Sequence, residues 1–573
     1  MKDYKASIAE VISGTVSELS VEEIMEIVEA PQDSKMGDYA FPCFKLAKTL
    51  RKAPPIIAQE IAAALSENEL FSKVEPVNAY VNFFLKREEL QRETLNKVFS
   101  EEDRFGTTTK GSGKTVIVEY SSPNIAKPFH IGHIRSTVIG NSIYKIYKAL
   151  GYDMIRINHL GDYGTQFGKM ISAYRRWGNK EDVEREPIKT LLGYYTKFHE
   201  EAENDPSLEE EARNIFLKLE QGNPEEVELW QWFRDESLKE FNRVYGMLGI
   251  EFDSYNGESF YSDKMPRIEK ELEEKGLMKE SQGARVVDLE EYGYGTALIK
   301  KSDGSSLYIT RDIAAAVYRK ETYDFYKNIY VVASQQTLHF QQLFKILELM
   351  GYKEASEGSI HIPFGLVSLE DGVMSTRQGR VVFLEDVLNS AVEKTREIIV
   401  EKNPNAENVD EIAAQVGIGA VIFNELSNNR IKDYTFKWDT ILNFDGETGP
   451  YVQYTHARCA SLLRRAGDDI VSKAKEVSAL NFDFVNSDNA YELVKLIYAY
   501  PTVVETAGAK YEPSIVTRHI IDVAQAFNRF YHDEHIIAEN EDEKIAKIAL
   551  VIATKTVIKN GLALLGVHAP ERM

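Results

Sequence analysis

The sequence predicts an α/β fold: a doubly wound, Rossmann-type parallel sheet in the middle of the chain, with an α+β domain before it and an all-α domain after it. Two middle segments alternate strand, helix and strand, the first hundred residues mix helical and strand-like stretches, and the chain beyond residue 446 has helical periodicity only. The 573 residues exceed the roughly 250–300 that a single hydrophobic core supports, so we expect about three or four domains.

Composition narrows the class of protein. The hydrophobic fraction of 43% excludes a chain that is disordered throughout. Cys43 and Cys459 are the only cysteines, which excludes a disulfide framework and a zinc-ligand cluster. The sequence contains neither a signal-peptide core nor an uninterrupted membrane-spanning stretch, so we expect a cytoplasmic protein without a membrane partner.

The net charge limits the kind of nucleic-acid binding. The chain has 68 Lys and Arg against 90 Asp and Glu, a formal net charge of −22. This charge argues against nonspecific coating of nucleic acid or of an anionic membrane. A nucleic acid that binds on local basic patches stays possible.

The first domain is predicted to span residues 1–110. Residues 8–19 and 54–65 have the apolar spacing of helices, and residues 80–85 have the aromatic and β-branched content of a strand. Residues 106–114 are rich in Gly, Thr, Lys and Ser, which is typical of a loop and marks the end of the domain.

A first strand–helix–strand unit follows at residues 116–120, 130–150 and 154–157. Gly151 comes directly after the helix and is a typical C-terminal stop. Such a unit implies parallel strands joined by a right-handed crossover, and ligands of parallel sheets bind beyond the carboxyl ends of the strands.

A second unit covers residues 329–333, 338–350 and 361–367. The two units complete a doubly wound domain, which we predict to span residues 111–385. Between them we expect a Glu-rich helical insertion at residues 170–283.

The rest of the chain is predicted to be helical. Residues 386–445 form a connection, and residues 446–573 form an all-α domain with its clearest helices at residues 491–500, 520–531 and 544–565. Lysines interrupt the last apolar stretch, so we expect an amphipathic helix there.

The most specific signal is the tetrapeptide His130-Ile131-Gly132-His133, at the turn between the first strand and its helix. Two imidazoles three residues apart face one side of a helix, and the amides of a helix N-terminus can bind phosphate. Gly132 has no Cβ, so a flat ring could approach the backbone. The alternatives are two histidines without special function or half of a metal site. The position at the switch point of the sheet favours a functional site.

The tetrapeptide resembles the HIGH signature of the class I aminoacyl-tRNA synthetases. Residues 119–136 and 158–168, together with the chain end at residues 569–573, resemble the arginyl-tRNA synthetases in particular. The resemblance implies a ligase that activates L-arginine with ATP and transfers it to the 3′ end of tRNA(Arg) in translation. It also implies a C-terminal anticodon-binding domain and an additional N-terminal domain that contacts tRNA through Asn82 and Phe84.

A second class I signature, KMSKS, resembles residues 373–380, although Val373 and Thr376 stand at the lysine positions. The resemblance assigns the missing positive charge to Lys127, just before the HIGH tetrapeptide. A solvent-facing loop lysine is the alternative for Lys127. The contribution of Arg377 or Arg380 stays open.

The chemistry of activation agrees with these assignments. Attack of a carboxylate on the α-phosphate of ATP builds negative charge, which positioned donors and cations stabilise. We therefore expect His130, His133 and Lys127 to be catalytic. The resemblance also implies that one strand lies beside the adenine of ATP and contacts it largely through backbone atoms. The expected ATP-binding set is His130, Gly132, His133, Lys127, Phe364, Val367, Met374, Ser375 and Arg377. Mg²⁺ is expected to accompany ATP, without a metal site of the protein's own.

A buried guanidinium needs planar acceptors and a paired carboxylate. Tyr308 and Asp312 lie four residues apart and share a face if a helix begins there. Asp312 alone could equally be a helix cap. The resemblance places Tyr308, Asp312 and Gln336 in the arginine pocket, and Ser122, Asn124 and His133 at the amine and carboxylate of the substrate.

Tyr451, Tyr454 and Arg458 have helical spacing, and two stacking rings with a cation suit unpaired RNA bases. An aromatic stripe that belongs to the core is the alternative. The stretch resembles the start of the family's anticodon-binding domain, and Met573 resembles the chain end that packs near the anticodon loop.

Two other interpretations stay open. One is a HIGH-type synthetase with a different amino-acid specificity. The other is a noncatalytic tRNA-binding paralogue, which the altered second signature makes conceivable and the intact HIGH tetrapeptide argues against. We expect the protein to be a monomer.

Overall fold

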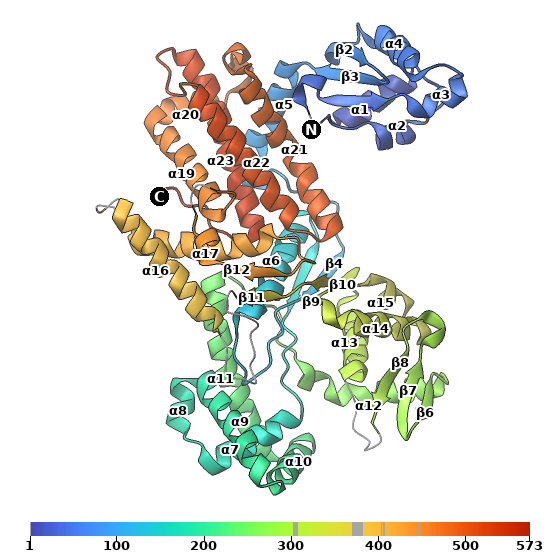
Figure 1. The fold of residues 1–573 in the computed structure, drawn as a ribbon, viewed down its shortest axis with the longest axis vertical. Helices are drawn as coiled ribbons and strands as arrows, with labels where there is room; N and C mark the ends of the chain where they lie inside the picture. The colour runs from blue at the N-terminus through green and yellow to red at the C-terminus, as the bar shows by residue number, and fades with distance from the viewer. Residues whose placement is uncertain are drawn as a thin grey trace. The chain divides into compact units, whose positions relative to one another are not determined.

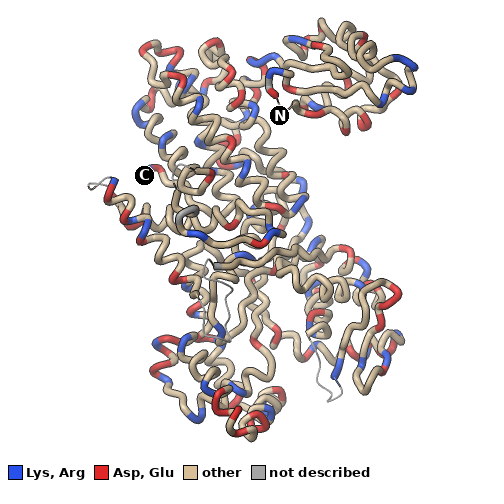
Figure 2. The backbone as a smooth tube through the Cα atoms, viewed as in Figure 1, with Lys and Arg blue, Asp and Glu red and all other residues tan. Residues whose placement is uncertain are grey.

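The computed structural model describes residues 2–31, 33–301, 308–369, 382–402, 404, 407–443 and 446–573. The chain divides into two compact units (Figure 1). Unit 1 comprises Met1–Phe105, Arg458–Pro501 and Asp522–Ile558, and unit 2 comprises Gly106–Ala457, Thr502–Ile521 and Lys559–Met573. Basic and acidic residues occur together in both units rather than in separate blocks (Figure 2).

The N-terminal part of unit 1 is α+β, as predicted. Strands β1 (Tyr39–Pro42), β3 (Tyr80–Leu85) and β2 (Phe71–Val77) form an antiparallel sheet in that order. The accompanying helices are α1 (Tyr4–Ser13), α2 (Val21–Ile27), α3 (Phe44–Leu50), α4 (Pro54–Leu65) and α5 (Arg87–Glu101). The helix predicted at residues 8–19 starts and ends earlier, because the Asp3 carboxylate caps the Ala6 amide at 3.0 Å and Gly14 follows the last turn.

The chain from Gly449 onward is helical, as predicted. Its main helices are α19 (Gly449–Ala466), α20 (Asp468–Ala474), α21 (Asp488–Lys510), α22 (Ser514–Asp533) and α23 (Glu541–Leu565). Although α23 is long and apolar enough to cross a membrane, 78% of its most apolar window is buried inside the protein, as in a core helix. The prediction that this helix is amphipathic is wrong. Lys547 itself is buried, and its ammonium pairs with Glu534 and Glu543 at 3.0 and 2.7 Å.

Unit 2 is built on a parallel sheet in the order β10 (Ser359–Phe364), β9 (Lys327–Ala333), β4 (Thr115–Glu119) and β5 (Asp153–Ile157). Helix α6 (Ile134–Ala149) connects β4 to β5, and helix α14 (Thr337–Leu349) lies between β9 and β10. The predicted doubly wound sheet is therefore confirmed. Helix α6 lies so close to the end of β4 that a Cβ at Gly140 would stand 2.2 Å from that of Tyr120.

The strand predicted at residues 361–367 is split in two. Strand β10 ends at Phe364, and β11 (Val367–Leu369) pairs with β12 (Tyr434–Phe436) in a separate parallel sheet. The chain turns at Gly365, whose amide donates to Arg430 O at 2.9 Å and where a Cβ would meet the Asp433 carboxylate at 2.5 Å. The predicted helical connection contains α16 (Leu384–Lys402), α17 (Val409–Ser427) and α18 (Trp438–Ile441), with β12 between the last two.

The chain between β5 and β9 forms two groups of elements (Figure 1). The first is helical, as predicted, with α7 (Thr165–Trp177), α8 (Lys180–Arg185), α9 (Pro187–Asn204), α10 (Ser207–Glu220) and α11 (Pro224–Leu248). The second contains α12 (Met265–Glu274), strands β6 (Met278–Ser281), β7 (Ala284–Asp288) and β8 (Thr296–Lys300), and α13 (Tyr308–Tyr323). Its antiparallel sheet was not predicted, because the strands have only four or five residues each and many exposed side chains.

A buried ion pair fastens α6 to α17. The Arg135 guanidinium and the Glu425 carboxylate lie 2.7 Å apart, and both side chains are 0% exposed. Arg135 Nη1 also donates to Lys432 O at 2.7 Å, and the Tyr434 hydroxyl donates to Glu425 at 2.5 Å. The helix that follows the HIGH tetrapeptide is thereby held from a distant part of the chain.

Candidate active site

The predicted catalytic, ATP-binding and arginine-binding residues that the structure describes lie where strands of the parallel sheet end. They stand in the loops after β4 and β9, at the start of α13 and around the turn after β10. The carboxyl ends of parallel strands meet at one edge of a sheet, which is where ligands of doubly wound folds bind. The site is therefore assembled from segments that are far apart in sequence.

The HIGH tetrapeptide forms a 3₁₀ turn, η3 (Ile131–His133), that runs into α6. His130 Nδ1 accepts the Gly132 amide at 3.1 Å, and His133 Nδ1 accepts the His130 amide at 3.1 Å. The Ile131 amide donates to Val382 O at 3.1 Å. The prediction that free amides at this turn bind phosphate is therefore wrong, because these donors already have partners.

Both imidazoles of the turn are neutral donors. Burial lowers the pKa of His133 to about 3; the repulsion that a protonated His130 would exert adds to this effect, and a hydrogen bond with the His130 backbone opposes it. Burial also lowers the pKa of His130. Each Nδ1 accepts an amide at 3.1 Å, and His133 Nδ1 also lies 3.3 Å from His130 O; the shorter amide contacts assign the proton of each neutral ring to Nε2. The turn thus offers two N–H donors and no positive charge, which leaves Lys127 as the predicted catalytic residue that supplies a cation.

The loop between β4 and η3 is strained. Ser121, Ser122 and Ala126 have φ values of 70°, 48° and 59°, a region that costs a residue other than glycine about 1–3 kcal/mol. The Ser121 hydroxyl compensates through hydrogen bonds with the hydroxyls of Tyr245 at 2.7 Å and Thr137 at 2.9 Å. In this loop the hydroxyl of Ser122 is buried without a hydrogen-bond partner among the described residues, and Asn124 is exposed.

The loop after β5 is held directly against the strained loop. The Ile125 amide donates to Gly161 O at 3.1 Å, and a Cβ at Gly161 would collide with the Asn124 side chain at 2.3 Å. The buried Asp162 carboxylate accepts hydrogen bonds from the Ser259 amide at 2.8 Å and from Arg234 Nε at 3.1 Å. Asp162 therefore has a structural role, which is to join this loop to α11 and to the chain after it.

Asp312 lies in the first turn of α13 and is ionised. Its carboxylate is 28% exposed and lies 2.7 Å from His339 Nε2. Burial opposes ionisation, but the hydrogen bond with His339 and the nearby charges of His339, His159 and Arg311 outweigh it and lower the pKa of Asp312. Burial likewise opposes the charge on His339, yet Asp312 raises the pKa of His339.

Glu258 is a second carboxyl group near Asp312, and the sequence did not reveal it. Its side chain is 16% exposed and lies 3.4 Å from the Arg311 guanidinium. Burial raises the pKa of Glu258 to about 7; Arg311 opposes this rise, Asp312 and Asp162 add to it, and Lys127 opposes it. Glu258 therefore lies within electrostatic reach of both Asp312 and the lysine before the HIGH turn.

Glu119 adds a third carboxylate at the end of β4. It pairs with the fully buried Arg319 at 2.6 Å and contributes to the raised pKa of His339. Arg319 also lies over the ring of Tyr330 at 5.6 Å. Glu119 belongs to the stretch that resembles the family. Neither its spacing nor its neighbours in sequence predicted the ion pair with Arg319.

The other predicted pocket residues lie at the same edge. Tyr308 is 61% exposed in the first turn of α13, and Gln336 is exposed in the 3₁₀ turn η6 (Ser334–Gln336) after β9. Phe364 and Val367 are buried, and the Leu366 amide between them donates to the Asp433 carboxylate at 2.6 Å. The predicted contacts of Met374, Ser375 and Arg377, with the rest of residues 373–380, lie outside the described residues.

The predicted tRNA contacts have different exposures. Tyr454 is 43% exposed on α19, and Tyr451 is partly buried. On the same helix the His456 ring bonds Pro570 O at 2.9 Å and Gln453 donates to His568 O at 2.8 Å, which holds the chain end with the partly exposed Met573 against α19.

The other three predicted tRNA contacts, Arg458, Phe84 and Asn82, lie in unit 1, and none of them is fully exposed. Arg458 lies 4.9 Å from the centre of the Tyr531 ring and donates to Asn528. Phe84 is partly exposed, whereas Asn82 is only 2% exposed. Asn82 is thus part of the core of the N-terminal sheet rather than of its surface.

Comparisons with known proteins cover the whole chain. Residues 94–438 match the family described as tRNA synthetases class I (R), catalytic domain; residues 452–573 match the DALR anticodon binding domain, and residues 2–85 match the arginyl tRNA synthetase N terminal domain. The chain is 58% identical to the arginine–tRNA ligase of Clostridioides difficile (strain 630) and 56% identical to that of Halothermothrix orenii, each over 573 residues and 100% of both chains.

Solved structures have the same fold. The arginyl-tRNA synthetase of Thermus thermophilus superimposes with a TM-score of 0.81 at 26% identity, over 99% of this chain and 100% of that chain. The arginyl-tRNA synthetase of Plasmodium falciparum gives a TM-score of 0.82 at 23% identity over 100% of both chains.

Proposed function

Since the chain belongs to the arginyl-tRNA synthetase family of class I, we propose that it is an arginine–tRNA ligase. It activates L-arginine with ATP to arginyl-adenylate and transfers the arginyl group to the 3′ end of tRNA(Arg) for translation. One observation carries the proposal: the carboxyl groups of Asp312 and Glu258 lie near each other and within electrostatic reach of Lys127, just before the HIGH turn. A guanidinium substrate and a triphosphate need these opposite charges side by side.

In the activation step, the arginine carboxylate attacks the α-phosphate of ATP and pyrophosphate leaves. His130 and His133 donate through Nε2–H to the phosphate oxygens, and Lys127 neutralises charge on the departing pyrophosphate. Neutral donors that are already oriented by their Nδ1 contacts need no reorganisation when the negative charge grows. Mg²⁺ arrives with the triphosphate.

The proposed arginine pocket has two ends. Asp312, with Tyr308 and Gln336, binds the guanidinium, and Glu258 adds an acceptor that the sequence did not suggest. Ser122, Asn124 and His133 hold the amine and carboxylate, since the Ser122 hydroxyl has no protein partner among the described residues. Lysine is rejected because one ammonium leaves planar acceptors partly unpaired.

The remaining assignments follow the family. Adenosine and phosphates contact Gly132, Phe364, Val367, Met374, Ser375 and Arg377, and tRNA contacts Tyr451, Tyr454, Arg458, Met573 and the N-terminal sheet near Phe84. The proposed domains are residues 1–110, 111–385 with an insertion at 170–283, 386–445 and 446–573. The protein acts as a cytoplasmic monomer.

The decisive test is ATP–pyrophosphate exchange with each of the twenty amino acids, with and without total tRNA. We expect exchange with arginine only, and only when tRNA is present. Exchange with another amino acid would favour a synthetase of different specificity, and no exchange or charging under any condition would favour a noncatalytic paralogue. Strong exchange without tRNA would contradict the proposed tRNA requirement.

Asp312→Asn should raise the KM for arginine by about 100-fold, because it leaves the bound guanidinium without its paired charge. The KM for ATP should stay nearly constant, since Asp312 does not face the phosphates. The measurement is steady-state exchange with tRNA. Asp324→Asn, an 89% exposed carboxylate just after α13, is the matched control and should leave both constants unchanged. An equal rise in the KM for arginine and in the KM for ATP would contradict the assignment of Asp312 to the arginine pocket.

Arginine binding should weaken as the pH falls through 7. With its pKa raised to about 7, Glu258 is mostly protonated at pH 6 and mostly ionised at pH 8. A guanidinium stays charged at both values and binds the ionised form, so binding at pH 6 must release a proton. We expect the KM for arginine to be about tenfold higher at pH 6 than at pH 8, because the ionised fraction of Glu258 falls about tenfold between these two values. Glu258→Gln should flatten this dependence, and an unchanged slope in that variant would contradict the assignment.

A further inference from the structure

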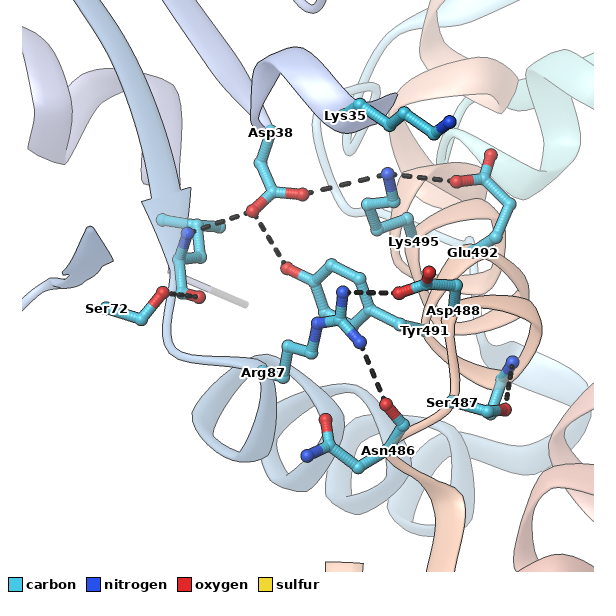
Figure 3. Close-up of polar contacts among 12 residues, drawn as sticks. Lys35, Asp38, Ser72, Arg87, Asn486, Ser487, Asp488, Tyr491, Glu492 and Lys495 are labelled. Carbon is cyan, nitrogen blue, oxygen red and sulfur yellow. Dashed lines mark hydrogen bonds and ion pairs between the residues drawn. The ribbon is translucent and has the colours of Figure 1, made fainter. Parts of the chain in front are cut away.

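One buried carboxylate fastens the N-terminal sheet of unit 1 to helix α21 (Figure 3). Asp38 is 8% exposed, and its Oδ2 accepts hydrogen bonds from the Leu85 amide at 2.9 Å and from the Tyr491 hydroxyl at 3.0 Å. Its Oδ1 lies 3.6 Å from Lys495 Nζ. Leu85 ends strand β3, whereas Tyr491 and Lys495 stand one turn apart on α21, so Asp38 joins the two parts. We call Asp38, Tyr491 and Lys495 the joint.

Helix α5, which follows β3, supports the joint from the other side. The Arg87 guanidinium lies over the Tyr491 ring at 4.6 Å and donates to Asn486 O at 2.8 Å. One turn later, Gln91 Nε2 donates to Val485 O at 2.6 Å. Tyr491, only 5% exposed, is thus held by its hydroxyl and by its ring.

The joint lies next to a side chain that suits RNA. Phe84 directly precedes Leu85, whose amide holds Asp38. The Phe84 ring is partly exposed and has Lys73 Nζ 5.1 Å from its centre. An aromatic ring beside a cation can stack on an unpaired base. Asp38 therefore holds the backbone directly next to the residue that carries this ring.

We propose that Asp38 is a positioning residue for tRNA: with Tyr491 and Lys495 it holds the strand that carries Phe84 at a fixed place on α21. The N-terminal sheet and the helical part of unit 1 then meet one tRNA with a fixed spacing. This rests on the proposed tRNA contact of the N-terminal domain. Two contact surfaces held in place bind one ligand more tightly than two loosely tethered ones, because the second contact requires less ordering.

Kinetics with two variants test the joint. Tyr491→Phe keeps the ring under Arg87 and removes only the hydroxyl, so the N-terminal sheet keeps its own contacts. Asp38→Asn removes the charge that faces Lys495. Each should raise the KM for tRNA(Arg) about five- to tenfold, with kcat and the KM for arginine changed by less than about twofold. The double variant should show little more than a single one, because both changes loosen the same joint. Asp33→Asn, an exposed carboxylate five residues away, is the control and should leave the KM for tRNA unchanged.

The joint can also be observed without RNA. Fluorescent labels at Gln59→Cys on α4 and Ser472→Cys on α20 occupy exposed positions in unit 1, and the native Cys43 and Cys459 are buried. Energy transfer between the labels should give a broader distance distribution in Asp38→Asn and Tyr491→Phe than in the wild type or in Asp33→Asn. An unchanged distribution in both joint variants would overturn the proposal.

Binding of two RNAs separates the joint from the function on which it rests. The joint variants should lose affinity for full-length tRNA(Arg) and keep their affinity for its isolated anticodon hairpin. Equal losses for both RNAs would indicate general destabilisation and overturn the positioning role. If the wild type bound both RNAs equally well, the N-terminal tRNA contact would be refuted, and a broader distance distribution would still show that the joint exists.

Discussion

Replacing His133 by alanine is expected to lower kcat/KM for arginine activation by about 100- to 1,000-fold, the usual effect of removing one fixed donor to a developing oxyanion. Because its Nδ1 already accepts the His130 amide, the ring can offer phosphate only Nε2–H. A pKa near 3 means that this donor is neutral at every working pH. ATP–pyrophosphate exchange with arginine and tRNA is the measurement.

Two conservative variants identify which nitrogen matters. Glutamine places an amide nitrogen at about the reach of Nε2, whereas asparagine reaches only the place of Nδ1. His133→Gln should therefore retain more exchange activity than His133→Asn, provided that both variants unfold at the wild-type temperature. The opposite order would show that the backbone contact of Nδ1, rather than donation to phosphate, carries the effect.

The sheet could be predicted because its signals are local. Strand β4 is a short β-branched run, α6 has a regular apolar face, and Gly151 stops it within two residues of the predicted end. Strand β11 could not be assigned in the same way, because it continues the run of β10 and is separated from it by contacts of Gly365 with Arg430 and Asp433. The sequence near Gly365 contains no trace of those partners.

The candidate site, like the sheet, could be predicted only in part. The HIGH tetrapeptide and Asp312 stand in stretches that resemble the family, so their proposed roles came from that resemblance, with residue type and spacing in agreement. Glu258 and His339 could not be predicted, because they become neighbours of Asp312 only when α13, α14 and the chain after α11 fold together. The protonation of the HIGH imidazoles needed the structure too, since burial and the backbone contacts of the turn, rather than the motif, make them neutral.

The buried ion pair of α6 should give the largest loss of stability. Glu425→Gln removes the charge opposite Arg135 and leaves a guanidinium buried without compensation, which typically costs about 3–5 kcal/mol. Arg135 cannot turn to solvent, because its guanidinium is also held by Lys432 O and lies 5.2 Å from the centre of the Tyr434 ring. We expect unfolding to reach its midpoint at a lower urea concentration. The loss of exchange activity is the measured signal, so that the transition of the catalytic unit is observed.

The charge, rather than the size, of Arg135 explains this cost, and a double variant can show it. Arg135→Met combined with Glu425→Leu removes both charges and fills similar volumes, so it should recover most of the stability that either single change loses. Asp410→Asn breaks the exposed pair with Arg396 and should leave the midpoint unchanged, since exposed pairs contribute little. If Glu425→Gln behaved like Asp410→Asn, the contacts of Arg135 with backbone carbonyls would suffice to hold α6 and the HIGH turn in front of it. The attraction between the two charges would then have no part in positioning the imidazoles of the HIGH turn.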